Sequence, residues 1–408
     1  MATTPRPPQR HPRSSPALMD DLVREIFLRV REDDPATLFR GAAGCRSWLS
    51  MLSAPEFARD YRRTCRAAAA PVLGFLHNTT NAREDRVSSH FVPTAAYRFR
   101  PRAGLGLSRW DVLDSRHGLV LFHYPKSKRN KGFVVCDLVT GQRWTFRDPE
   151  FYNMMWWHLG DHMDNRVRCS ASVLCAKAQC DHLDCHGGPF RVALVGTNDA
   201  NLRTHATVYS SETRQWSETI SIHNPDFVNG RGNSALVGNK VYVQCVESDN
   251  IVEYNMHEQK LSLITLPFED QEGIDSTIEL MGVEDGSLLF ASLLEAKLYL
   301  WTMEAGPGGA AGWARRWAIE LEPSLPARVL GNMANTLAGF AEGVGVIFLS
   351  TNAGLYALEL NSGEGNKVHQ RWFGKVVPYT SFCTRAIGRL AGLSHALGWP
   401  TRASVLEQ

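Results

Sequence analysis

The sequence DSRHGLVLFHYPKSKRNKGFVVCDLVTGQRW, residues 114–144, contains two short apolar runs, then a polar turn and a tryptophan. GLVLF and FVVCD are apolar at successive positions, so both faces of each run are apolar. Short runs of this kind, bounded by turn signals, are typical of β-strands buried between two layers. The stretch therefore predicts a pair of strands with neighbours packed on both sides.

The same order of strand, strand, polar turn and aromatic residue returns along the chain. The copies lie at residues 114–144, 190–216, 234–264, 283–317 and 343–372. Their second strands begin near residues 134, 207, 252, 299 and 356, at intervals of 45 to 73 residues. A period near 50 residues is that of a four-stranded propeller blade. We therefore predict a propeller-like, all-β domain over residues 72–383.

A helical pattern precedes these strands. Apolar residues recur at helical spacing from Leu18 through Leu22 and Ile26, and a second helix is predicted to begin at Asp34-Pro35, a capping residue before a proline. Further helices are predicted from Cys45 and from Pro55. The predicted fold class is α+β multidomain, with a small all-α module over residues 17–66 followed by the all-β domain.

The two ends of the chain fit neither pattern. Residues 1–16 hold five prolines and three arginines and no acidic residue, which is typical of a disordered tail. In residues 384–408, Ile387, Leu390, Leu393 and Leu397 keep helical spacing, which predicts a helical segment in this tail.

Composition and charge exclude several classes of protein. The formal charge is +2, so the chain as a whole has no field that would attract nucleic acid or anionic lipid. No window has the roughly 18 apolar residues that a membrane span needs. The start of the chain has no apolar segment typical of a secretory signal, and the nine cysteines indicate free thiols. We expect a soluble protein of the cytoplasm or nucleus.

The helical pattern resembles an F-box. The positions that carry the resemblance are Leu18, Leu22, Glu25-Ile26, Asp34-Pro35, Leu38, Cys45, Trp48, Leu52, Pro55, Phe57 and Tyr61, within residues 16–63. Two positions depart from the family pattern, since Met19 replaces the usual proline and Gly44 replaces the usual valine. The loss of a side chain at Gly44 predicts weaker binding to the adaptor that this family uses.

The strands resemble the β domain of a large plant family of F-box proteins, especially those of grasses. Phrases such as VVCDLVTGQRW, ATVYSSETRQWSE and VVPYTSF carry this similarity along residues 72–383. The resemblance implies a substrate-recognition subunit of an SCF-type cullin-RING ubiquitin ligase that is not itself an enzyme and needs no cofactor. Its partners are then a Skp-type adaptor, through it a cullin, and an unknown target protein. The adaptor-binding residues are predicted to be Leu18, Met19, Leu22, Ile26, Leu38, Cys45 and Trp48, of which the last three either complete the surface or brace it from behind.

One segment invites a metal site. Residues 175–188, CAKAQCDHLDCHGG, hold Cys175, Cys180, His182, Cys185 and His186. Structural zinc usually takes ligand pairs spaced C-x2-4-C from separate elements, whereas here the spacing is C-x4-C-x4-C within one loop. We favour a reduced loop between blades and predict no metal.

Four further segments are weaker candidates. HLGDHMD (158–164) lacks the glutamate of an H-E-x-x-H site and is predicted to be a connecting loop. The cluster from Tyr152 to Trp157 suits either burial between blades or target binding, and burial is favoured. KSKRNK (126–131) is predicted to be a solvated hairpin tip, and GPGGAAG (306–312) a loop.

Two alternatives to the ligase subunit stay open. The β domain is a metal-dependent enzyme that uses the Cys and His loop, or the chain is an F-box scaffold that acts outside the ligase. No Ser-His-Asp, Cys-His or paired-carboxylate spacing stands out to support the enzyme.

Overall fold

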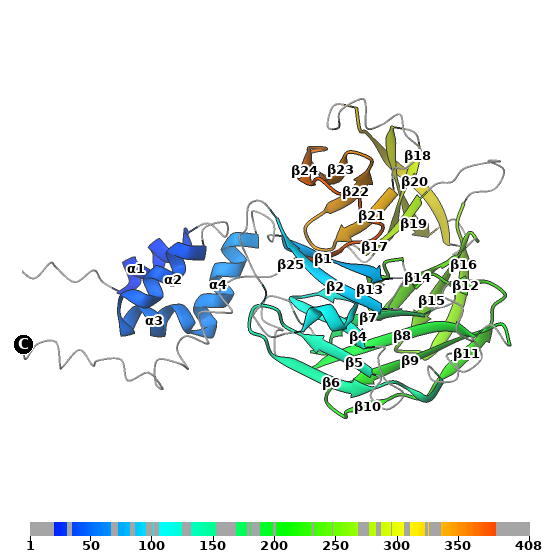
Figure 1. Cartoon of the computed structure of the whole chain (residues 1–408), viewed down its shortest axis with the longest axis horizontal. Coiled ribbons are helices and arrows are strands. Elements are labelled where there is room, and N and C mark those ends of the chain that lie inside the picture. Colours follow the sequence, from blue (N-terminus) through cyan, green and yellow to red (C-terminus); the bar gives the residue numbers. More distant parts are fainter. Residues whose placement is uncertain are drawn as a thin grey trace, which may run out of the picture.

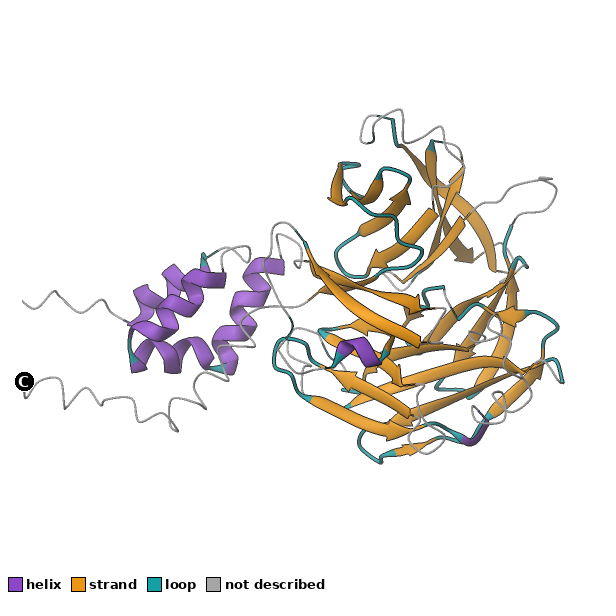
Figure 2. Cartoon of the chain, in the orientation of Figure 1, coloured by secondary structure: helices purple, strands orange, loops and turns teal. Residues whose placement is uncertain are grey.

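The computed structural model describes residues 20–30, 35–66, 72–81, 86–94, 101, 106–124, 132–151, 169–177, 180, 188–198, 201–230, 232–246, 248–267, 277–282, 287–294, 296–305, 311–322, 325 and 336–380. The α-helices gather at one side of the strands, whereas the short 3-10 helix η1 (Leu107–Arg109) precedes β3 (Asp111–Arg116) within the propeller (Figure 2). The predicted tails, residues 1–16 and 384–408, lie outside the described residues. None of the described helices is long and apolar enough to span a bilayer.

Four helices form the module before the first strand (Figure 1). They are α1 (Asp20–Leu28), α2 (Pro35–Gly44), α3 (Arg46–Ser53) and α4 (Pro55–Arg66). Their starts confirm the sequence signals, because prolines occupy the first position of α2 and α4, where the missing N–H costs nothing. The helices share one core, in which Leu38, Leu52, Phe57 and Tyr61 are almost completely buried.

All described strands belong to six sheets, which are the blades of a six-bladed propeller. Five sheets hold strands that follow one another along the chain. The first contains β3 (Asp111–Arg116), β4 (Leu119–Tyr124), β5 (Gly132–Cys136) and β6 (Arg143–Arg147). The second contains β7 (Cys169–Cys175), β8 (Phe190–Asn198), β9 (Arg203–Ser210), β10 (Gln215–Trp216) and β11 (Ile220–His223).

The remaining consecutive sheets repeat this order. One contains β12 (Phe227–Val228), β13 (Ala235–Val237), β14 (Lys240–Val246), β15 (Asn250–Asn255) and β16 (Lys260–Thr265). The next contains β17 (Thr277–Gly282), β18 (Leu288–Leu294), β19 (Lys297–Ala305) and β20 (Ala311–Glu320). The last contains β21 (Thr336–Ala341), β22 (Val346–Thr351), β23 (Gly354–Glu359) and β24 (Gly365–His369).

The sixth sheet joins the two ends of the domain. Its strands are β1 (Val72–Asn81), β2 (Arg86–Pro93) and β25 (Val377–Thr380), in the order β2-β1-β25. All pairs are antiparallel, with Val72 opposite Thr380 and Leu76 opposite Val377. Strand β25 contacts β3 on one side and β21 on the other, so this sheet closes the ring.

The repeat predicted from sequence is confirmed. The five aligned runs are β5, β9, β15, β19 and β23, which occupy the same place in their blades. Strand β4 is buried on both faces, as predicted, because Val120 and Phe122 enter one core cluster while Leu119 and Leu121 enter the next. The sixth blade produced no repeat signal, because its strands come from residues about 300 apart in the sequence.

The turns after β5, β9, β15 and β23 share one backbone feature: the residue four positions after the end of the aligned run has a positive φ. After β5 and β23 this residue also donates its backbone N–H back to the run, from Gly141 to the Asp137 carbonyl (2.7 Å) and from Gly363 to the Glu359 carbonyl (2.8 Å). Arg214 and Gln259 occupy the same place with φ of 58° and 51°. The turn residues therefore set the register between each such strand and the next.

The prediction of a loop over residues 306–312 is wrong for its last two residues. Strand β20 already begins at Ala311, and Gly312 pairs with Glu304 of β19. A glycine is tolerated there because the strand pairing uses only the backbone. Residues 126–131, the predicted hairpin tip, lie outside the described residues, between β4 and β5.

Candidate functional site

Helix α1 has two apolar faces. Val23, Phe27 and Leu28 are buried in the core of the module. Leu22 and Ile26, one turn apart, are 52% and 54% exposed. We call these two residues the exposed pair. Residues at i and i+4 lie side by side on a helix, so the exposed pair forms one apolar strip that the rest of the described chain does not cover.

The other predicted adaptor contacts are placed differently. Leu18 and Met19 lie outside the described residues. Leu38 is only 1% exposed, which fits the second of its two predicted roles, bracing the adaptor surface from behind; its part in adaptor binding stays a prediction. Leu38 packs in the core of the module, so it can support the adaptor surface only from behind. The sequence could not distinguish the two roles, because a buried leucine and an exposed one keep the same helical spacing.

Cys45 and Trp48 form one local unit at the start of α3. The exposed Cys45 caps the helix, and its Sγ accepts the backbone N–H of Trp48 at 3.5 Å. The ring of the partly buried Trp48 lies edge-on to Phe27 of α1, with centroids 5.5 Å apart. A Cβ at Gly44 would lie 3.3 Å from the Trp48 ring, so the absent side chain leaves room for this ring.

Polar contacts fix α1 against α4. Arg24 forms an ion pair with Asp60, and the Tyr61 hydroxyl donates to the Val30 carbonyl at 2.9 Å. The Phe27 ring of α1 packs directly against Gly41 of α2, where a Cβ would meet the ring at 2.3 Å. None of these contacts was predicted from the sequence, although a glycine within a helical pattern, such as Gly41, signals close packing.

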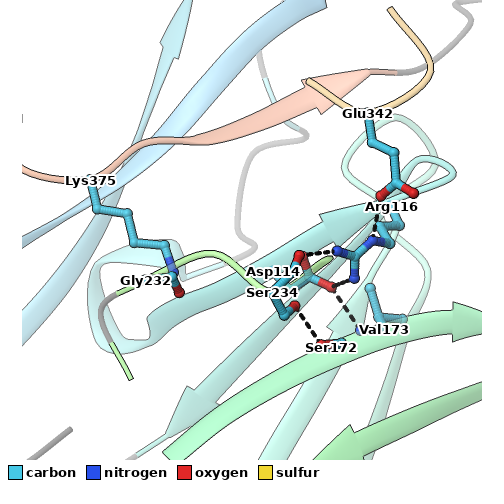
Figure 3. Close-up of polar contacts among 8 residues, drawn as sticks. All are labelled: Asp114, Arg116, Ser172, Val173, Gly232, Ser234, Glu342 and Lys375. Atoms are coloured by element: carbon cyan, nitrogen blue, oxygen red, sulfur yellow. Dashed lines mark hydrogen bonds and ion pairs between the residues drawn. The ribbon is translucent and has the colours of Figure 1, made fainter. Parts of the chain in front are cut away.

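A second polar site lies on the inner strands of the propeller (Figure 3). Arg116 of β3, only 7% exposed, donates from Nη1 to Asp114 Oδ2 (2.9 Å), from Nε to Glu342 Oε2 (2.7 Å) and from Nη2 to the Ser234 carbonyl (2.6 Å). Burial alone would lower the pKa of Arg116, but the charges of Asp114 and Glu342 outweigh burial and raise it.

The same network reaches further blades. Asp114 Oδ2 accepts the backbone N–H of Val173 in β7 at 2.8 Å, and the hydroxyls of Ser172 and Ser234 are 2.6 Å apart. The residues come from β3, β7, the segment before β13 and the turn after β21. We call this set, with Arg116 at its centre, the axial network. It ties four blades together at the axis.

A buried acid and a lysine stand beside the axial network. Glu279 of β17 is 4% exposed and accepts a hydrogen bond from the Asn233 amide. Burial raises its pKa to about 7. Lys375, just before β25, donates to the Gly232 carbonyl at 2.7 Å, and burial lowers its pKa.

Two of the described thiols are buried, and the described residues include no group of metal ligands. Burial raises the pKa of Cys136 to about 12 and that of Cys245 to about 11, so both thiols stay protonated near neutral pH. Across the part of the chain that the structure describes, no three His, Cys, Asp or Glu side chains are placed to hold a metal ion. Cys175 and Cys180 are described, whereas His182, Cys185 and His186 are not, so the prediction for this loop stays a prediction. The segments 152–157 and 158–164 also lie outside the described residues.

Comparison with solved structures finds other proteins of low similarity. The Nidogen/Laminin complex matches at 12% identity and a TM-score of 0.40, over 76% of this chain and 100% of that one. TolB from Acinetobacter baumannii matches at 15% identity and a TM-score of 0.34, over 77% and 71%. The dihydro-heme d1 dehydrogenase NirN in complex with DHE matches at 14% identity and a TM-score of 0.30, over 73% of this chain. The matched part spans about half, 48%, of NirN.

Comparison with curated proteins finds no match. A family profile, described as F-box protein AT5G49610-like, beta-propeller, matches residues 111–381. The matched segment begins at the first residue of β3 and ends just after β25, so it covers five blades and the closing strand of the sixth. The chain therefore belongs to the family of F-box protein AT5G49610-like β-propellers.

Proposed function

We propose that this protein is the substrate-recognition subunit of an SCF-type cullin-RING ubiquitin ligase. The helical module binds a Skp-type adaptor, and through it a cullin, while the propeller binds the target protein. Family membership supports the role in recognition, because the matching profile is that of an F-box protein propeller. The module lies outside the matched residues, so its role is supported by its own geometry.

The observation that carries the proposal is the exposed pair. Leu22 and Ile26 together form an apolar strip on a helix that already has a complete buried face. Exposed apolar strips at i and i+4 are the anchors by which helices bind in apolar grooves of partner proteins. An isolated apolar side chain on a surface is ordinary, whereas two adjacent ones at about half exposure indicate a contact surface.

The proposed role requires binding and geometry from this chain and no bond-breaking chemistry. A ligase of this kind acts by holding a target lysine near the ubiquitin-charged enzyme, which raises the effective concentration of the two reacting groups. The proposed role places the protein in the cytoplasm or nucleus, where such ligases act.

The test is adaptor affinity. The full-length chain and the double variant Leu22→Ala, Ile26→Ala are compared for binding to a Skp-type adaptor by calorimetry. We expect the double variant to lose about 100-fold in affinity, which is the loss of roughly 2–3 kcal/mol typical of truncated anchor residues. Leu263→Ala is the matched control, since Leu263 is also an exposed apolar residue (39%) but lies on β16 of the propeller. Equal affinity of all three proteins would remove α1 from the interface.

A further inference from the structure

A small cavity lies at the propeller axis. Its volume is about 30 Å³, which is room for roughly two water-sized groups. The inner strands β3, β17, β21 and β25 contribute to its lining. Three carboxylates line it, from Asp114, Glu279 and Glu342, together with the guanidinium of Arg116.

The charges around this cavity do not balance. Arg116 is shared by Asp114 and Glu342. Glu279 faces Asn233, its hydrogen-bond donor, and Lys375, whose ammonium donates to the Gly232 carbonyl. No ion pair joins Glu279 to a cation among the described residues, although it is 4% exposed. With Glu279 ionised, the three lining carboxylates stand against Arg116 and the nearby Lys375, and Asp111 adds a further negative charge close to Lys375, so the site is at least one positive charge short.

The titration of Glu279 agrees with this charge count. Burial raises its pKa to about 7, and the Asn233 hydrogen bond and the charge of Lys375 offset only part of that effect. Near neutral pH the carboxyl is therefore divided between its protonated and ionised forms. A cation placed in the cavity would favour the ionised form, so its binding would release a proton.

We propose that the axial cavity binds the ammonium group of a lysine side chain that a target protein inserts into the propeller. An ammonium is close to water in size and is a compact point charge with three donors, which suits Glu279 and the second oxygen of Glu342 as acceptors. The Glu342 side chain, which lines the cavity, is 33% exposed, so the cavity can be reached from solvent beside Glu342. A metal ion suits the site less well, because the three carboxylates do not converge as metal ligands in the described part of the chain.

The inference deepens the proposed function, since it rests on the propeller being the target-binding domain. The first experiment measures the thermal unfolding of the full-length chain near pH 8 in ammonium, methylammonium, tetramethylammonium or sodium chloride at equal ionic strength. We expect ammonium and methylammonium to raise Tm by about 2 °C over sodium, and tetramethylammonium, which is too large for the cavity, to give no rise. The rise should be smaller near pH 6, where more of Glu279 is protonated.

Variants locate the effect. Glu279→Gln keeps an acceptor for Asn233 but not the charge, so the rise with methylammonium should disappear, whereas Glu320→Gln, at an exposed ion pair with Lys297, should keep it. If Glu279→Gln does not fold, the size comparison in the wild-type chain decides the question alone. Equal Tm values in all four salts, or an equal rise in Glu279→Gln, would overturn the proposal.

A final arm identifies the source of the amine. A short peptide with one lysine is compared with the same peptide carrying acetyl-lysine. Stabilisation by the lysine peptide alone supports a protein-borne amine, whereas stabilisation by methylammonium and not by the peptide overturns the assignment to a target lysine. The adaptor is absent from these experiments, so their failure would leave the docking role of α1 untouched.

Discussion

The helical module and the propeller differ in how their strand edges and apolar side chains are covered. The propeller closes on itself, because β25 from the end of the domain pairs with β1 from its beginning. Its outer strands carry exposed cations, such as Arg143 and Arg147 on β6 and Lys367 on β24, which discourage pairing with other chains. The module instead leaves Leu22 and Ile26 uncovered one turn apart on a single helix, whereas the exposed apolar side chains of the propeller, such as Leu263 and Trp372, lie on separate segments. From this comparison we expect the propeller to be stable by itself and, under the proposed function, the module to be completed by a partner.

The largest effect should come from opening the ring. Tyr379 of β25 is completely buried, packs with the core between β25 and its neighbours, and its hydroxyl donates to the Gly118 carbonyl at 3.3 Å. Tyr379→Ala removes a large buried ring at the closure, so we expect the free energy of unfolding of the propeller to fall by about 4 kcal/mol. Chemical denaturation followed by tryptophan fluorescence measures this.

The same variant tests the separation between the two regions. If the module is an independent unit, Tyr379→Ala should leave adaptor affinity unchanged at temperatures where the propeller is folded. A parallel loss of adaptor affinity would show that the two regions depend on each other, and the comparison would fail.

A smaller effect separates core from surface inside the module. Leu38 and Leu22 are the same residue type on neighbouring helices, but Leu38 is 1% exposed and Leu22 is 52% exposed. Leu38→Ala should lower the free energy of unfolding of the module by about 3 kcal/mol, because it leaves a cavity in a small core. Leu22→Ala should change it by less than about 0.5 kcal/mol while weakening adaptor binding. Helix circular dichroism during denaturation, together with adaptor affinity, distinguishes them, and equal stability losses would contradict the assignment of Leu22 to the surface.

This pair of leucines also shows what the sequence can predict. Periodicity identified α1 to α4 and the third strand of five blades, because each depends on residues close together in the chain. Periodicity cannot tell which of two apolar faces meets a partner, so it left open whether Leu38 lies on the surface or behind it. The partners of the axial network are far apart in sequence, with Arg116 and Glu342 separated by 226 positions. No local pattern records such a contact, so the network and the closing blade became visible only in the structure.

The smallest expected effect concerns His77, on strand β1 of the sixth blade. His77 of β1 lies between His90 of β2, with ring centroids 5.5 Å apart, and Phe373, at 4.7 Å. Burial, followed by the charges of His90, His369 and Arg371, lowers the pKa of His77 to about 4, although a hydrogen bond with the backbone of Asn78 opposes this. The imidazole is thus neutral in the folded protein at pH values where it is protonated in the unfolded chain.

A depressed pKa in the folded state makes stability depend on pH in one direction. The contribution of His77 is fully present above about pH 6.5 and is lost as the pH falls toward 4, because only the unfolded chain binds the proton in this window. His77→Gln cannot titrate, so its loss of stability between these pH values should be smaller than that of the wild type by roughly 1–2 kcal/mol. Denaturation at several pH values measures the difference, with His257→Gln, on the exposed turn after β15, as the control. Identical pH profiles for all three proteins would mean that the site of His77 accepts a charged imidazole without loss of stability. This part of the sixth blade would then tolerate a charge as well as the exposed surface of α1 does.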